Sequence, residues 1–119
     1  MEKIEHNEPN LLDLIPVKIV EWGKNGDGTI FLKEPKVKSP FFQRLIAFLG
    51  KSPYYKVQLD EFGSHVWENC NGEYRVEQIA ENLRQKFGEK VEPVYERLGA
   101  FVKVLASQKF IVYKGMSKS

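Results

Sequence analysis

Residues 59–87 (LDEFGSHVWENCNGEYRVEQIAENLRQKF) constrain the fold more than any other stretch. They predict a short helix, whose first-turn N–H groups Asp60 can cap, and an Asn-Gly turn at residues 71–72. A second helix follows, because apolar residues recur at i, i+3, i+4 and i+7 before Gly88. Its apolar stripe consists of Val76, Ile79, Ala80, Leu83 and Phe87. We expect the rest of the chain to pack on this helical pair.

Three strands are predicted before this pair. Residues 17–22 (VKIVEW) and 29–33 (TIFLK) flank the turn sequence GKNGDG, which predicts a β-hairpin. Residues 54–59 (YYKVQL) alternate apolar and polar side chains, as expected of a half-buried third strand. Residues 11–15 form a compact apolar cluster that fits either one helical turn or an extended segment.

The segment 36–53 predicts an extra helix between the second and third strands. Ser39 suits the N-cap and Pro40 the first helical position, and Gly50 follows the helix. The apolar residues of this helix are Phe41, Phe42, Leu45, Ile46, Phe48 and Leu49. We expect an ordinary helix with one side docked on the domain. The alternative is that its apolar side contacts a partner or a second copy, so that residues 41–49 form a homodimer interface.

A third helix is predicted from Pro93 to about Gln108, and residues 110–113 (FIVY) form a short terminal strand or arm. The expected fold is therefore a single α+β domain over residues 1–119, with a loose N-terminus at 1–10. A small three-stranded antiparallel sheet packs on a three-helix bundle that resembles a winged helix-turn-helix. The helical segment at 36–53 is inserted between strands 2 and 3.

Composition excludes several classes of protein. The 18 basic and 16 acidic residues are mixed along the chain, which argues against a nucleic-acid-binding surface. A single cysteine rules out an internal disulfide and fits a reducing compartment. The longest apolar run is far short of a membrane span, so we expect a cytoplasmic protein that makes no use of a membrane.

No catalytic or metal-binding constellation stands out. His65 and Cys70 are five residues apart, and His6 lies in the loose terminus, so three converging zinc ligands are missing. Ser64 and His65 are adjacent and point apart on a helix, and no second histidine in the ordered sequence can activate Cys70. We therefore expect neither enzyme activity nor a metal or cofactor, and interpret the cysteine as a small buried residue.

DNA binding is the alternative function, because the third helix could serve as the recognition helix of a winged helix. Its polar residues are Glu92, Glu96, Arg97, Lys103, Ser107 and Gln108. The two glutamates lie near the N-terminal end, which normally approaches the bases, and they would face phosphates unfavourably. Nucleic acid is therefore the less favoured ligand.

Turn and core residues between positions 59 and 88 follow a distinctive spacing. The pattern is Leu59-Asp60-x-x-Gly63-x-x-Val66-Trp67, then Asn71-Gly72, Val76, Ile79-Ala80, Leu83 and Phe87-Gly88. This spacing resembles that of the PqqD family. The late helix with Phe101 and Leu105, followed by Phe110-Ile111, fits as well, so the likeness covers residues 54–113. It implies a small non-catalytic domain of three strands and three helices.

The resemblance also implies a function. Family members linked to pyrroloquinoline quinone biosynthesis are peptide chaperones, and related domains are peptide recognition elements. They hold the leader part of a ribosomally made precursor peptide and present it to a radical S-adenosylmethionine (SAM) enzyme. The peptide adds as a strand to the third strand and lies along the third helix. On this chain the resemblance implies a groove made by that strand and an exposed edge of the helix. The groove residues are Tyr55, Lys56, Val57, Gln58, Leu59, Val94, Leu98, Val102 and Leu105.

Overall fold

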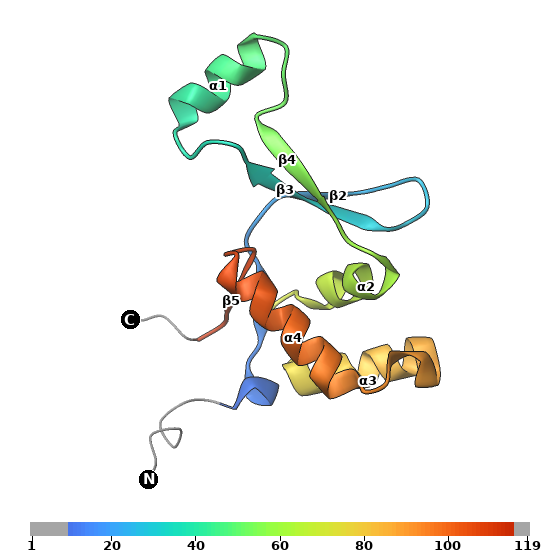
Figure 1. The fold of residues 1–119 in the computed structure, drawn as a ribbon. Coiled ribbons are helices and arrows are strands. Elements are labelled where there is room, and N and C mark those ends of the chain that lie inside the picture. Colours follow the sequence, from blue (N-terminus) through green and yellow to red (C-terminus); the bar gives the residue numbers. More distant parts are fainter. Residues whose placement is uncertain (1–9, 116–119) are drawn as a thin grey trace. The chain divides into compact units, whose positions relative to one another are not determined.

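The computed structural model describes residues 10–115 of the chain (Figure 1). Its backbone contacts divide into two compact units. The first, here called the helical unit, comprises Met1–Ile19 with His65–Ser119, and the second, the sheet unit, comprises Val20–Ser64. The loose N-terminus expected at 1–10, with His6, lies outside the described residues except for Asn10. That the chain forms one domain stays a prediction.

The sheet unit contains a three-stranded antiparallel sheet in the order β2-β3-β4. The strands are β2 (Trp22–Lys24), β3 (Ile30–Pro35) and β4 (Tyr54–Gln58). Asn25 donates its backbone N–H to the Thr29 carbonyl oxygen at 2.8 Å, which closes the turn between β2 and β3. Gly28 has φ +91°, a conformation that glycine adopts without strain. A hairpin around the predicted turn and the third strand are confirmed, but the first strand of the hairpin is Trp22–Lys24 and shares only Trp22 with the predicted strand 17–22.

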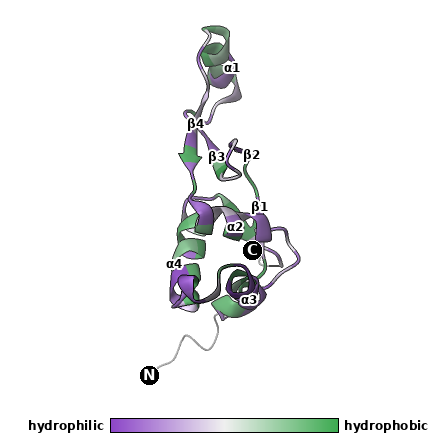
Figure 2. Ribbon diagram, turned by 90° about the vertical axis from the view of Figure 1, so that its right-hand side faces the viewer, coloured by the Kyte–Doolittle hydropathy of each residue, from purple (hydrophilic) through white to green (hydrophobic). Residues whose placement is uncertain are grey.

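Helix α1 (Pro40–Phe48) joins β3 to β4 and lies beyond the ends of these two strands (Figures 1 and 2). Ser39 lies at the N-cap position and Pro40 in the first turn, as predicted, but the Ser39 side chain makes no cap hydrogen bond. None of its residues is buried, so the expectation of a docked helix is wrong. Only Gln43 and Ile46 are partly covered, and the Gln43 side-chain amide donates to the Val37 carbonyl oxygen at 2.8 Å. Of its large apolar side chains only that of Ile46 is partly covered, because Phe41, Phe42, Leu45, Phe48 and Leu49 are all exposed.

Helix α2 (Glu61–Asn69) begins in the sheet unit and continues in the helical unit. The Asp60 carboxylate accepts the Gly63 N–H at 2.7 Å, which confirms the predicted cap. Helix α3 (Val76–Phe87) buries four of the five residues of the predicted stripe, Val76, Ile79, Ala80 and Leu83, and the fifth, Phe87, is half-buried. A single helical turn of 3-10 type, η3 (Gly88–Val91), leads to α4 (Val94–Ser107).

The helical unit has its own two-stranded antiparallel sheet, in which β1 (Pro16–Lys18) pairs with β5 (Ile111–Tyr113). The prediction that residues 17–22 form one hairpin strand is therefore wrong. The Lys18 N–H donates to the Cys70 carbonyl oxygen and the Ile19 N–H to that of Phe110, both at 3.0 Å. These bonds tie the first half of the predicted strand to the helical unit, and only its last residue, Trp22, belongs to β2.

The apolar cluster at 11–15, for which two conformations were left open, contains both. Residues Leu11–Asp13 form a 3-10 turn, η2, capped by the Asn10 side-chain oxygen, which accepts the Leu12 N–H at 2.9 Å. Leu14 then adopts an extended conformation that leads into β1. In the described residues the chain thus has four α-helices and a three-stranded antiparallel sheet, which confirms the α+β class. The winged-helix arrangement stays a prediction.

Candidate functional site

Strand β4 lies at one edge of its sheet. It pairs with β3 in the register Leu32–Val57 and Lys33–Lys56, and no other strand of the described residues pairs with it. An edge strand presents backbone N–H and C=O groups that a further strand can bind. This open side of β4 is the candidate site.

Hydrogen bonds at the two ends of β4 fix which of its residues face the open side. In an antiparallel pair, alternate residues direct their backbone groups toward the neighbouring strand. Leu59 donates its N–H to the Ile30 carbonyl oxygen at 2.9 Å, and Pro53 accepts the Lys36 N–H at 2.8 Å. Odd-numbered residues of β4 therefore bond to β3, and the backbone groups of Tyr54, Lys56 and Gln58 point to the open side.

Two of these three residues offer their backbone groups to a ligand. The hydroxyl of Ser52 accepts the Tyr54 N–H and donates to the Tyr54 carbonyl oxygen, both at 3.2 Å, so this residue is already engaged locally. Among the described residues, no hydrogen bond outside the β3–β4 ladder involves the backbone N–H or C=O of Lys56 or of Gln58. Lys56 and Gln58 therefore supply two donors and two acceptors, spaced as an added strand requires.

The Gln58 side chain anchors the end of β4. Its amide nitrogen donates to the Leu59 carbonyl oxygen at 2.6 Å and to the Thr29 hydroxyl at 3.1 Å, and its oxygen accepts from the Asn25 amide at 2.8 Å. These bonds hold β4 against the β2–β3 turn, so this side chain positions the strand. Sequence reasoning missed this role and that of Ser52, because both depend on partners that local periodicity does not reveal.

The side chains of β4 divide between the two faces of the sheet as the alternation predicted. Leu59 is buried and Val57 half-buried, while Lys56 and Gln58 are exposed. The ammonium of Lys56 lies 4.6 Å from the centre of the Phe31 ring, a cation–π contact on the polar face. Tyr55 differs from the prediction, since it is 58% exposed; it lies near the α1 end of the strand, opposite Glu34.

The four predicted site residues of α4 are buried. Val94, Leu98 and Val102 have no exposed surface and Leu105 has 2%, so the expectation that they form an exposed edge is wrong. They lie on one side of the helix at helical spacing, which is the pattern of a core face. The exposed apolar side chains of α4 are Tyr95 and Val104. A role in peptide binding for the four buried residues stays a prediction.

The nucleophile and metal-ligand candidates lie apart from β4 in sequence. Cys70 is buried, its thiol donates to the Val66 carbonyl oxygen at 3.3 Å, and burial raises its pKa to about 12. His65 lies 3.9 Å from the Glu68 carboxylate and packs edge-on against Phe87. Within residues 10–115, no three metal-ligating side chains come together. No helix in this range has the length and apolar character needed to cross a bilayer.

Comparison with known proteins gives one match. The family model described as coenzyme PQQ synthesis protein D (PqqD) matches residues 51–111, more than half of the chain. The matched range runs from the residues before β4 through α2, α3 and α4 to the first residue of β5, and it leaves α1 out. No curated protein and no solved structure matches the chain.

Proposed function

The chain belongs to the PqqD family, and on this premise we propose that it is a non-catalytic peptide-binding protein. It holds the leader part of a ribosomally made precursor peptide by strand addition to β4. It then presents the peptide to a modifying enzyme of the radical SAM type. A part for Val94, Leu98, Val102 and Leu105 of α4 stays a prediction, because these buried side chains would first have to become exposed to touch a peptide.

The open side of β4 carries this proposal. Lys56 and Gln58 direct two N–H and two C=O groups away from β3, and the Gln58 side chain keeps the strand in place. A peptide in extended conformation satisfies these four groups and completes a fourth strand of the sheet. Main-chain bonds then provide the affinity, and neighbouring side chains provide the selection.

The charges beside the open edge indicate which leader sequences fit best. Lys33 and Lys56 lie directly opposite each other on the polar face, an unfavourable like-charge pair. Lys33 has the Glu21 carboxylate 4.0 Å away, whereas Lys56 has only the Phe31 ring among the contacts of the described residues. A carboxylate on the added strand next to Lys56 offsets the repulsion. We therefore expect an acidic leader residue at this position.

Backbone amide NMR of the full chain tests the proposal. The probe is a panel of synthetic leader peptides, with the leader of the pyrroloquinoline quinone precursor among them. We expect the largest shifts, and slowed hydrogen exchange, at the amides of Lys56 and Gln58, because these gain hydrogen bonds to the peptide. If every leader of the panel leaves the β4 amides unchanged, the proposal is refuted.

A salt titration separates this mode of binding from DNA binding. Strand addition relies on main-chain hydrogen bonds, so the affinity for a leader peptide should change little with salt. Binding to a DNA duplex releases counterions and should weaken by orders of magnitude as salt rises from about 50 to 200 mM. A duplex that binds more tightly than every leader peptide and shows this salt dependence would favour a regulator over a peptide carrier.

A further inference from the structure

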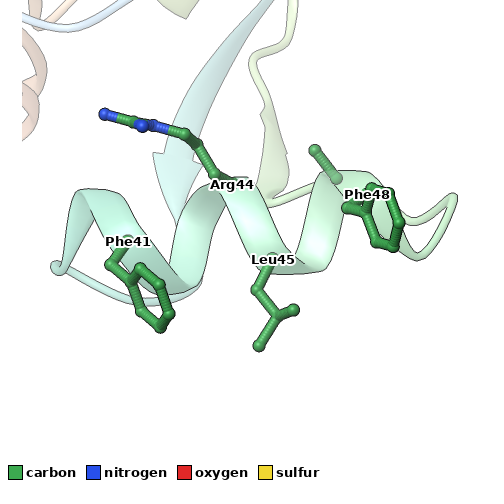
Figure 3. Close-up of a pocket in the computed structure, with 5 residues that line it drawn as sticks. Phe41, Arg44, Leu45 and Phe48 are labelled. Carbon is green, nitrogen blue, oxygen red and sulfur yellow. The ribbon is translucent and has the colours of Figure 1, made fainter.

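Helix α1 carries an apolar face that the described chain leaves uncovered. Phe48 is 85% exposed, and the other four residues of this face are between 43% and 69% exposed. Figure 3 shows Phe41 and Leu45 extending from one side of the helix and Arg44 from the opposite side. The face consists of Phe41, Phe42, Leu45, Phe48 and Leu49. Its exposure is unusual, because large apolar side chains on a monomer normally bury or bind a partner.

The five side chains form one continuous stripe. At about 100° of rotation per residue, they fall within an arc of roughly 120° around the helix axis. Gln43 and Ile46, the two half-covered residues, lie outside this arc. The rings of Phe41 and Phe42 touch edge-to-face, with centroids 5.3 Å apart, so the aromatic groups stay together on the surface. The helix is therefore amphipathic, and its apolar side faces outward.

All charged residues in the segment around α1 are basic. Residues 36–53 contain Lys36, Lys38, Arg44 and Lys51 and no acidic residue, whereas the rest of the chain has two more acidic than basic residues. All four basic side chains are exposed, and with the described residues none of them forms a salt bridge. The net positive charge of the chain therefore comes from the segment that carries the apolar face.

We propose that α1 docks on an anionic lipid surface, which departs from the expectation above that the protein makes no use of a membrane. A short amphipathic helix with Phe and Leu on one face and basic residues beside it binds the interface between lipid headgroups and acyl chains. With nine residues, α1 is about 14 Å long, far less than the roughly 30 Å of a bilayer core, so it lies in the membrane surface. The phosphates of anionic lipids complement the four basic side chains.

A second copy of the chain fits this face less well. Pairing two α1 helices brings together two segments that each carry four basic residues and no acidic residue, so no charge on one copy complements the other. A stable interface also buries about 800 Å² on each partner, more than one face of a nine-residue helix provides. A lipid surface requires no matching cavity and carries the opposite charge. The proposal does not depend on peptide binding, because α1 lies outside the range that matches the family.

Vesicle co-sedimentation of the full chain tests the proposal. One set of vesicles is phosphatidylcholine alone, and the other is equal parts phosphatidylcholine and phosphatidylglycerol. We expect binding to the anionic vesicles that weakens with salt, and little binding to the neutral ones. Arg44→Gln with Lys51→Gln should lower the affinity about 25-fold, since each basic residue near the surface contributes about fivefold. The matched control, Lys86→Gln with Lys90→Gln, removes two exposed charges elsewhere and should change little.

Two further variants test the apolar face directly. Phe41→Ser with Phe48→Ser should lower vesicle affinity at least tenfold, because two aromatic side chains no longer enter the lipid. Val104→Ser, an exposed apolar residue of α4, is the matched control and should bind like the parent. Circular dichroism checks that each variant keeps its helices. In Phe48→Trp, the added fluorescence should shift to shorter wavelength on anionic vesicles.

Three results would overturn the proposal. The first is no binding to anionic vesicles. The second is binding that Phe41→Ser with Phe48→Ser leaves unchanged. The third is sedimentation as a dimer that the same substitutions dissociate, without any vesicle binding, because a second copy would then cover the face. Leader-peptide binding is measured on the same variants, and its retention shows that the two activities are independent.

Discussion

A proline at position 56 offers the sharpest test of strand addition to β4. Lys56→Pro removes one backbone N–H from the open side of the strand. The ladder to β3 keeps its hydrogen bonds, because these come from the odd-numbered residues of β4. Proline is accepted in edge strands where its nitrogen faces away from the sheet. The matched control, Lys56→Ala, removes the side chain and keeps the N–H.

The expected effect follows from the one hydrogen bond that is lost. A carbonyl group of the bound peptide keeps no donor, and an unsatisfied buried acceptor costs about 1–3 kcal/mol. The dissociation constant for the leader peptide should therefore rise about 5- to 150-fold. Lys56→Ala loses an exposed charge and its contact with the Phe31 ring, but no group that bonds to the peptide backbone, and the attraction of that charge to the peptide is screened at high salt. At high salt the alanine variant should bind like the parent, while the proline variant stays weak.

Fluorescence anisotropy with a labelled leader peptide measures both variants at low and high salt. Urea unfolding and the amide spectrum of β3 show whether the sheet remains intact. Equal affinities for the proline and alanine variants at high salt would refute the backbone mechanism. A second test leaves the protein unchanged. N-methylation of successive peptide residues should weaken binding at every second position only, since only alternate amides face β4.

Three other predictions concern stability and reactivity. Leu83→Ala should lower the free energy of unfolding by about 2–5 kcal/mol, because this side chain is fully buried; a urea midpoint like that of the parent would contradict it. The Cys70 thiol, with a pKa raised to about 12 by burial, should react with a thiol reagent at pH 8 only after unfolding in urea, and rapid labelling of the folded protein would contradict this. The hydrogen bond from Arg84 lowers the pKa of Glu92 in the folded state below its ordinary value of 4.5. The ionised Glu92 therefore stabilises the fold above pH 4.5, and this stabilisation is lost as the pH falls through the pKa of Glu92 in the folded protein. Glu92→Gln should accordingly lower the melting temperature at pH 7 more than at pH 3, and an equal change at both pH values would contradict the assignment.

Local signals predicted the elements whose structure depends on neighbours in the sequence. The stripe of α3, the Asp60 cap and the Ser39-Pro40 start of α1 each lie within one or two helical turns. The turn at residues 25–29 depends on glycine and asparagine in the same way. These features agree with the structure because the interactions that form them are between residues only a few positions apart.

Features that depend on distant partners were predicted poorly. Residues 17–22 have the composition of a strand, but composition does not specify that Val17 pairs with Val112. The apolar spacing of α1 predicts which residues share a face, yet it does not say whether that face is covered. The same holds for α4, where helical spacing identified Leu98 and its neighbours and could not tell a buried face from an exposed one. In the candidate site, alternation predicted the two faces of β4, but not that Gln58 anchors it.

The backbone groups of β4 point outward at every second residue, so the candidate site repeats every two residues along the strand. Since only every second residue faces outward, an added peptide shifts along the edge by two residues at a time and keeps the same side chains on each face. A shift by one residue exchanges the faces. Inserting two residues into a leader peptide therefore preserves its side-chain pattern against Lys56, whereas inserting one residue inverts it. The strand therefore selects a peptide both by its sequence and by whether its spacing is shifted by an even or an odd number of residues.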